Sequence, residues 1–185
     1  MNNIKRLLDN YRRQVSLPWS TNMAGKQRVW FAVYPPDDER RLRARLPDFE
    51  TATLAANHGW LHVDLTRLLP EYLAAHKYRE KIFEQPQHLR VGTDLEVRAA
   101  ALISETCSHS DANSNCVVTV TGLASLFDFI RVSNLIERVE DSVHGRLLIF
   151  FPGEYTGNIY RFMDAREGFN YLAVPITSSE NFINP

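Results

Sequence analysis

The sequence has no excess of charge of one sign and no long hydrophobic run, and each absence excludes a class of protein. Its 185 residues carry 21 lysines and arginines against 22 aspartates and glutamates, which gives a formal net charge of -1. Proteins that bind nucleic acid through its backbone usually carry a basic excess, so we expect no direct nucleic-acid binding. No stretch approaches the roughly 18 apolar residues of a membrane helix, so we expect no membrane partner.

Cysteine is also scarce. Cys107 and Cys116 are the only two, which is too few for a disulfide framework. The N-terminal residues MNNIKRLLDNYRRQ lack the apolar run and cleavage site of a secretion signal, so we expect a cytoplasmic protein. His109 and Asp111 lie between the cysteines and add metal-ligand types. The paired spacing that holds zinc is missing, so we expect neither a metal nor another cofactor.

What the sequence does contain is an alternation of strand-like and helix-like segments. Apolar, β-branched segments fall at residues 28–34, 60–65, 116–122, 146–151 and 171–176, with helical patterns between them. This order predicts an α/β fold, with a mainly parallel sheet of about five strands flanked by helices. The architecture is Rossmann-like, or P-loop-like without Walker motifs. The length predicts one domain over residues 1–185, with an N-terminal helical extension at 1–22 and a tail at 177–185.

Proline and glycine predict several boundaries. Pro47 should interrupt the helix that follows the first strand, because a proline favours the first turn of a new helix. Gly59 is a natural end for that second helix. Pro152 and Gly153 should end the fourth strand and open a tight loop. Residues 160–168 then read as a short helix or turn, and residues 70–85 as one longer helix.

The segment TVTGLASLFDFIRVSN has the strand–glycine–helix order in which a nucleotide-binding P-loop would occur. A P-loop needs a second glycine and a lysine after the first glycine, to wrap and neutralise the phosphates. Only Gly122 is present, with Phe127 at the second glycine position and Asp128 in place of the lysine. Triphosphate hydrolysis is therefore not expected. A degenerate nucleotide- or phosphate-binding domain stays open, because a helix N-terminus after Gly122 could hold an anion without the lysine.

Two polar residues follow Gly122 in the same segment. Ser125 precedes Asp128 by three residues, which is the spacing of a capping box at a helix start. Arg131 should then lie about two turns into a helix over residues 124–143. Its side chain could form a structural ion pair or carbonyl cap, or it could contact a partner.

The fourth strand leads into PGEYTG. Gly153 and Gly157 bracket Glu154 and Tyr155 and favour a tight ordered loop. A lone acid at a strand end is more often a turn residue than a catalytic one, and a tyrosine serves equally as a core or an interface anchor. A hydrolase that uses Asp64 or Glu154 is a weaker alternative.

These segments carry a resemblance. GLASLFDFIRVSNLIERVED, RLLIFFPGEYTGNIYRF and NYLAVPI resemble the C-terminal signature of the BrxB family of BREX phage-defence systems, and the N-terminal half matches more loosely. The most specific block is PGEYTG, with Pro152, Gly153, Glu154, Tyr155 and Gly157. Asp128 and Ala173 depart from the family pattern.

The resemblance implies a cytoplasmic component of a multi-protein anti-phage system. It implies as partners other BREX proteins, with the alkaline-phosphatase-like PglZ first and the BrxC ATPase second. It also implies a non-catalytic scaffold or adaptor that bridges those proteins, not an enzyme. The candidate interface or signature residues are Gly122, Ser125, Arg131 and the five residues of the PGEYTG block.

Overall fold

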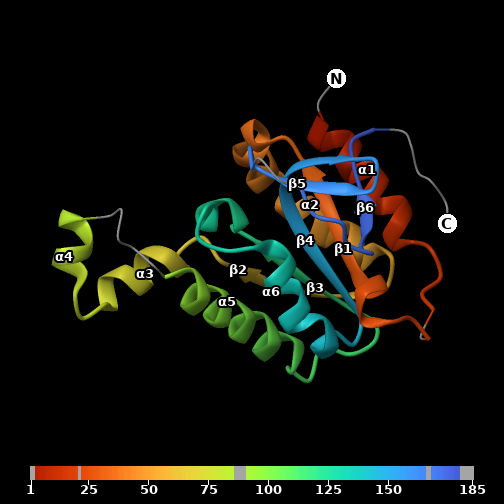
Figure 1. Ribbon diagram of the computed structural model, residues 1–185. Coiled ribbons are helices and arrows are strands. Elements are labelled where there is room, and N and C mark those ends of the chain that lie inside the picture. Colours follow the sequence, from red (N-terminus) through yellow and green to blue (C-terminus); the bar gives the residue numbers. More distant parts are fainter. Residues whose placement is uncertain (1–2, 21, 86–90, 166–167, 180–185) are drawn as a thin grey trace.

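The computed structural model describes residues 3–20, 22–85, 91–165 and 168–179. They form an α/β fold around a sheet with strand order β2-β3-β4-β1-β6, all parallel, as the sequence predicts (Figure 1). The strands are β1 (Val29–Tyr34), β2 (Gly59–Asp64), β3 (Cys116–Thr121), β4 (Arg146–Thr156), β5 (Ile159–Phe162) and β6 (Val174–Ile176). β5 lies off this path and pairs antiparallel with the end of β4. β6 is an edge strand, a position in which Pro175 is tolerated.

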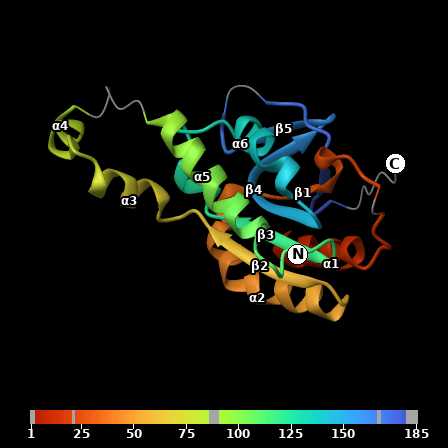
Figure 2. The same cartoon turned by 90° about the horizontal axis from the view of Figure 1, so that it is seen from below.

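Helices cover both faces of the sheet, and Figure 2 shows the layers edge-on. The helices are α1 (Asn3–Val15), α2 (Glu39–Ala55), α3 (Leu68–Ala75), α4 (Arg79–Glu84), α5 (Gly92–Cys107) and α6 (Val132–Val139). α1 and α2 pack on one face, and α5 and α6 on the other. Strands β1 and β3 are therefore buried along their whole length, which explains why their sequences are apolar without alternation.

Each face has its own core. The α1–α2 side buries Trp30 and Phe150 from the sheet against Phe49 of α2 and Tyr11 of α1. The helix expected in the N-terminal extension is present as α1, and its apolar stripe lies in this core. Asn10 of α1 donates hydrogen bonds to main-chain carbonyls at the start of the predicted tail. Residues 180–185 of that tail lie outside the described residues.

Two predicted helix boundaries are wrong. α2 runs unbroken through Pro47. Leu42 before the proline and Phe49 after it are buried in the same core, so tertiary packing holds both halves in one helix despite the missing hydrogen bond. The helix also ends before Gly59, because Asn57 supplies the left-handed conformation with a φ of 63° and Gly59 already begins β2.

The single helix predicted over residues 70–85 is two helices. His76 has extended backbone angles, so α3 ends there and α4 starts three residues later. The two helices form an arm that extends away from the sheet (Figure 1). α4 has no buried residue, and Tyr78 and Phe83 on the arm are 54% and 65% exposed.

Candidate functional site

All eight residues that the sequence singles out lie toward one end of the molecule, where the parallel strands finish. We call this end the carboxyl edge. The structure divides them into three groups: Gly122 and Ser125 beside a polar network, Arg131 in a cleft, and the PGEYTG residues in a hairpin. No described hydrogen bond or ion pair joins the first group to the other two, so the sequence predicts the edge but not this division.

Gly122 follows β3 and has a φ of 83°, in the left-handed region that favours glycine. The loop after β2 approaches it closely. A Cβ atom at Gly122 would lie 2.4 Å from the main-chain nitrogen of Thr66 and 2.7 Å from Oδ1 of Asp64. Gly122 is thus required for the close packing of two loops. Thr66 and the Asp64 carboxylate therefore lie directly against the side of Gly122 where a side chain would project.

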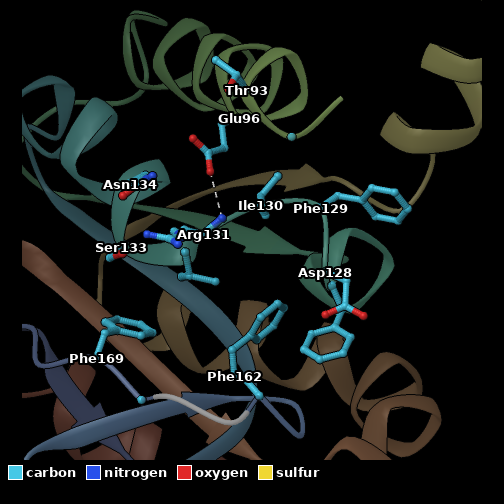
Figure 3. Close-up of a pocket in the computed structure, with 15 residues that line it drawn as sticks. Thr93, Glu96, Asp128, Phe129, Ile130, Arg131, Ser133, Asn134, Phe162 and Phe169 are labelled. Carbon is cyan, nitrogen blue, oxygen red and sulfur yellow. Dashed lines mark hydrogen bonds between the residues drawn. The ribbon is translucent and has the colours of Figure 1, made fainter. Parts of the chain in front are cut away.

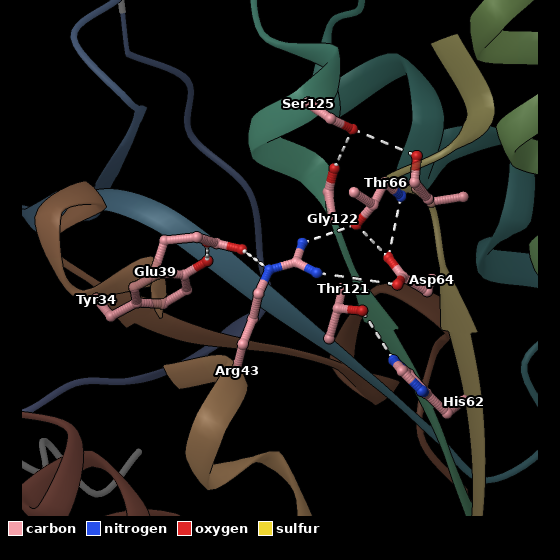
Figure 4. A network of polar contacts seen from close by, with 10 residues as sticks. Tyr34, Glu39, Arg43, His62, Asp64, Thr66, Thr121, Gly122 and Ser125 are labelled. Carbon is pink, nitrogen blue, oxygen red and sulfur yellow. Dashed lines mark hydrogen bonds and ion pairs between the residues drawn. The ribbon is translucent and has the colours of Figure 1, made fainter. Parts of the chain in front are cut away.

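The predicted capping box at Ser125 is wrong. Its hydroxyl donates to the carbonyl oxygen of Gly122 at 2.7 Å, and the carbonyl of Leu65 lies at 3.3 Å (Figure 4). Residues 123–126 form one 3-10 turn instead of the start of a long helix. Asp128 is exposed, with a left-handed φ of 65°, so the chain turns away before any helix forms.

A chain of polar contacts runs along this part of the edge (Figure 4). Arg43 of α2 is at its centre and donates to Glu39 at 2.8 Å and to the hydroxyl of Thr66 at 2.7 Å. Glu39 also accepts a hydrogen bond from Tyr34, the last residue of β1. Asp64 accepts from the main-chain N–H of Thr66 at 2.9 Å and lies 3.9 Å from Arg43. The network therefore ties α2 to the loop after β2.

The network changes the acidity of its members. Partial burial alone would raise the pKa of Asp64, but the hydrogen bonds from Thr66 and the positive charge of Arg43 outweigh it and lower the pKa. Burial lowers the pKa of His62, which contacts Thr121 at 2.8 Å on the same face of the sheet. Asp64 is thus an ionised acceptor already engaged by Thr66, which makes a structural role its best-supported one.

Arg131 does not lie two turns into a helix, and that prediction is wrong. It stands immediately before α6, with extended backbone angles. Its main-chain N–H donates to Oε1 of Glu96 at 2.9 Å (Figure 3). Glu96 belongs to α5 and is only 7% exposed, so a buried carboxylate caps the start of the neighbouring helix. The Arg131 side chain is exposed.

Arg131 lines an open cleft of about 600 Å³ between α5, the start of α6 and the chain after β5 (Figure 3). The cleft is lined mainly by residues 127–134, with Gly92, Thr93, Glu96, Phe162, Ala165, Gly168 and Phe169. Among the described residues, its walls thus combine four phenylalanine rings with one arginine. Gly92 is needed here, because a Cβ at that position would lie 2.3 Å from the carbonyl oxygen of Phe129. We refer to this feature as the cleft.

The sequence predicts that PGEYTG forms a loop at the end of the fourth strand, and that prediction is wrong. β4 continues through Pro152 and Gly153 and turns back as β5. Pro152 is tolerated because β3 pairs with β4 only as far as Ile149, so no ladder bond to β3 is lost. Gly153 is required, since a Cβ there would lie 2.1 Å from the carbonyl oxygen of Arg161. The segment that the sequence assigns to a helix or turn is therefore partly β5.

The turn of this hairpin (residues 153–162) is at Gly157 and Asn158, which have φ angles of 57° and 64°. Two consecutive left-handed residues are typical of the tight turns that join antiparallel strands. The hydroxyl of Tyr155 donates to Asn158 at 2.9 Å, and its ring centre lies 4.6 Å from that of Tyr160. Glu154 is exposed and lies opposite Arg161.

An aromatic cluster beneath the hairpin holds it in place. Tyr160 and Phe162 point into the core on alternate positions of β5, where Tyr160 packs on Phe31 of β1 and on Phe151 of β4. The Tyr160 hydroxyl donates to the carbonyl oxygen of Ala173 at 2.8 Å. Phe162 also lies in the wall of the cleft. The hairpin is thus a firmly anchored projection next to the cleft.

The candidate metal ligands do not form a centre. Cys107 and Cys116 are free and buried, and burial raises the pKa of Cys116 to about 11. Among the described residues, no group of three or more histidine, cysteine or acidic side chains could hold a metal ion. Within the same residues, no helix is both long and apolar enough to cross a bilayer.

Sequence reasoning missed Arg43, Glu96 and Phe169. The spacing of Glu39 and Arg43, four residues apart in a helix, is a signal that could have found the first ion pair. Glu96 and Phe169 reach the cleft only through tertiary packing, and no local pattern marks them.

Comparison with known protein families shows the family to which the chain belongs. The family model described as "BREX protein BrxB" matches residues 61–176, well over half of the chain. The chain belongs to the BrxB family. The resemblance found in the sequence is thus confirmed, and membership makes the protein a component of a BREX phage-defence system that works with other BREX proteins. The match covers the Gly122 loop, the cleft and the hairpin. No curated protein and no solved structure matches the chain.

Proposed function

We propose that the protein is a non-catalytic adaptor that bridges partner proteins of a BREX complex through the cleft and the adjoining hairpin. The observation that carries the proposal is the composition of the cleft, with phenylalanine rings around an exposed arginine. Aromatic and arginine side chains supply a large share of the binding energy at protein interfaces. An anchored hairpin beside them adds a surface that loses little conformational freedom on binding.

The polar groups of the cleft support a binding role over a catalytic one. Glu96 already accepts the main-chain N–H of Arg131. Asp128 is exposed on a turn, and the described residues that line the cleft include no histidine, cysteine or lysine. Nucleophile and base side chains in hydrogen-bond contact are the usual sign of covalent catalysis. The arrangement around Arg131 instead presents a positive charge to a partner that carries an acidic group.

The Gly122 loop gives less support to the alternative of a nucleotide- or phosphate-binding domain. Thr66 and Asp64 pack directly against Gly122, which gives the glycine a structural reason without a phosphate. The Asp64 carboxylate would also repel the anion. We therefore place the partner-binding surface at the cleft and the hairpin, and not at the Gly122 loop.

Co-purification tests the proposal. The tagged protein is expressed with its genomic BREX neighbours, and the proteins that elute with it are identified by mass and stoichiometry. We expect a stable complex with the alkaline-phosphatase-like PglZ, or with the BrxC ATPase. Elution of the protein alone, from cells that make all the neighbours, would contradict an adaptor role.

A further inference from the structure

The opposite, amino-terminal edge of the sheet contains a buried cation that has no acidic partner among the described residues. Arg146, the first residue of β4, is 4% exposed. Its guanidinium lies 4.7 Å from the ring centre of Trp19 and 5.8 Å from that of Trp30. Its hydrogen-bond partners are neutral: the carbonyl oxygens of Gly145 and Ser20 and the sulfur of Met23. Buried charges are normally paired, because desolvation of a charge is costly.

A second arginine stands beside the first. Val29 of β1 pairs with Leu147 of β4, so Arg28 and Arg146 are neighbours at the starts of adjacent strands. Burial, and then the charge of Arg28, lower the pKa of Arg146. Within the part of the chain that the structure describes, neither arginine forms an ion pair with a carboxylate. Two like charges therefore lie together, and no described carboxylate forms an ion pair with either of them.

Two N–H donors at the same place also lack an acceptor. Nε of Arg146 and Nε1 of Trp19 are both buried and have no hydrogen-bond partner among the described residues. In the same residues, Thr119 Oγ1 is the one other buried side-chain polar atom without a partner. Buried polar groups are nearly always satisfied in folded proteins. Two orphaned donors and two unpaired cations indicate that an acceptor with negative charge is missing.

Both residues line a pocket of about 350 Å³. Its walls are Trp19, Ser20, Arg28, Ser114, Asn115, His144 and Arg146. Every one of these side chains carries an N–H or O–H donor, and none is acidic. Ser114 and His144 are exposed, so the pocket is reached from solvent.

We propose that this pocket, here named the Arg146 pocket, binds a phosphate group. Two guanidinium charges match the double negative charge of a phosphate monoester, whereas one carboxylate would balance only one of them. Hydroxyl, amide and imidazole donors around the rim suit the several acceptor oxygens of phosphate. The site lies at the opposite edge of the sheet from the cleft and the Gly122 loop, so it is independent of the adaptor proposal.

Titration with inorganic phosphate, at constant ionic strength, tests the inference. Thermal unfolding and the indole N–H signals of the three tryptophans in a ¹⁵N-labelled sample are followed together. We expect a saturable rise in Tm of several degrees, and a shift of the Trp19 indole signal over the same concentrations. A parallel titration with AMP distinguishes free phosphate from a nucleotide, since tighter binding of AMP would show that the nucleoside also contributes.

Two variants locate the binding. Arg28→Gln removes one charge and keeps an N–H donor for the carbonyl of Val143, to which Arg28 now donates at 2.7 Å. Ser114→Asp places a carboxylate at the exposed rim. Each should weaken phosphate binding at least tenfold, while Ser110→Asp, an equal charge change in the same loop outside the pocket, should not. If Arg28→Gln does not fold, Ser114→Asp decides. Absence of a saturable response in the unmodified protein, or an unchanged response in Ser114→Asp, would overturn the inference.

Discussion

The main-chain N–H of Arg131 donates a 2.9 Å hydrogen bond to the buried carboxylate of Glu96, which joins the start of α6 to α5. This contact fixes the backbone from which the Arg131 side chain enters the cleft (Figure 3). A residue of α5 thus positions the candidate binding residue that immediately precedes α6. The geometry of the cleft depends on Glu96, even though Glu96 is not expected to touch the partner.

Glu96→Ala should therefore destabilise the fold by about 1–2 kcal/mol, the usual cost of losing a helix cap. Glu96→Gln keeps an acceptor oxygen for Arg131 and should cost clearly less. Urea unfolding of both variants measures the difference. Glu105→Gln, an exposed position on the same helix, is the control and should leave the free energy of unfolding unchanged. Equal stability of Glu96→Ala and the unmodified protein would show that the cap contributes nothing.

Gly122 and Gly157 form a matched pair of left-handed glycines. Alanine at Gly157 must adopt a left-handed φ of 57°, but its Cβ meets no atom within 4 Å. We expect this substitution to lower the free energy of unfolding by about 1 kcal/mol. Alanine at Gly122 meets Thr66 at 2.4 Å as well and should cost about 3 kcal/mol or more. Chemical denaturation of the two variants gives both numbers. If both variants lose a similar free energy of unfolding, the loops that follow β2 and β3 separate easily to admit the Cβ at Gly122.

Asp64 should contribute to the pH dependence of stability. Its pKa is lowered in the folded protein from the ordinary value of 3.8. Such a group stabilises the fold above its unfolded pKa, and that contribution is lost as the pH falls through the folded pKa. Asp64→Asn should thus reduce stability at pH 7 and flatten the loss of stability below about pH 4. Urea midpoints at pH 7 and pH 3, with the exposed Asp37→Asn as control, check this. If both variants lose the same stability between pH 7 and pH 3, Asp64 does not contribute to the pH dependence.

Arg131 offers a direct test of the interface. Arg131→Glu reverses the exposed charge in the cleft and should reduce partner recovery in co-purification about tenfold or more, because interface arginines are frequent hot spots. Arg138→Glu makes the same change within α6, seven residues further along the chain and outside the cleft. It should leave partner recovery unchanged. Circular dichroism confirms that both variants are folded. If the two variants recover equal amounts of the partner protein, Arg131 is not part of the interface.

The sequence predicts the parallel α/β sheet and its helical layers, because apolar runs and helical stripes are local patterns. It mispredicts elements whose conformation depends on distant contacts. Pro47 stays inside α2 because Leu42 and Phe49 share one core. β4 passes through Pro152 because β3 has already stopped pairing with it.

In the candidate site, too, the sequence predicts what local patterns determine and misses what depends on distant contacts. The edge at which Gly122, Arg131 and Tyr155 lie follows from the strand directions. Their separate environments do not, because Glu96, Thr66 and the rings beneath the hairpin come from other parts of the chain.

Hydrogen–deuterium exchange, measured on the protein alone and in the purified complex, shows whether a BREX partner covers the cleft and the hairpin. We expect slower exchange on partner binding in residues 127–134 and 153–162, with no change at the amino-terminal edge around Arg146. Protection confined to another surface, such as the arm formed by α3 and α4, with unchanged exchange at the cleft and the hairpin, would contradict it.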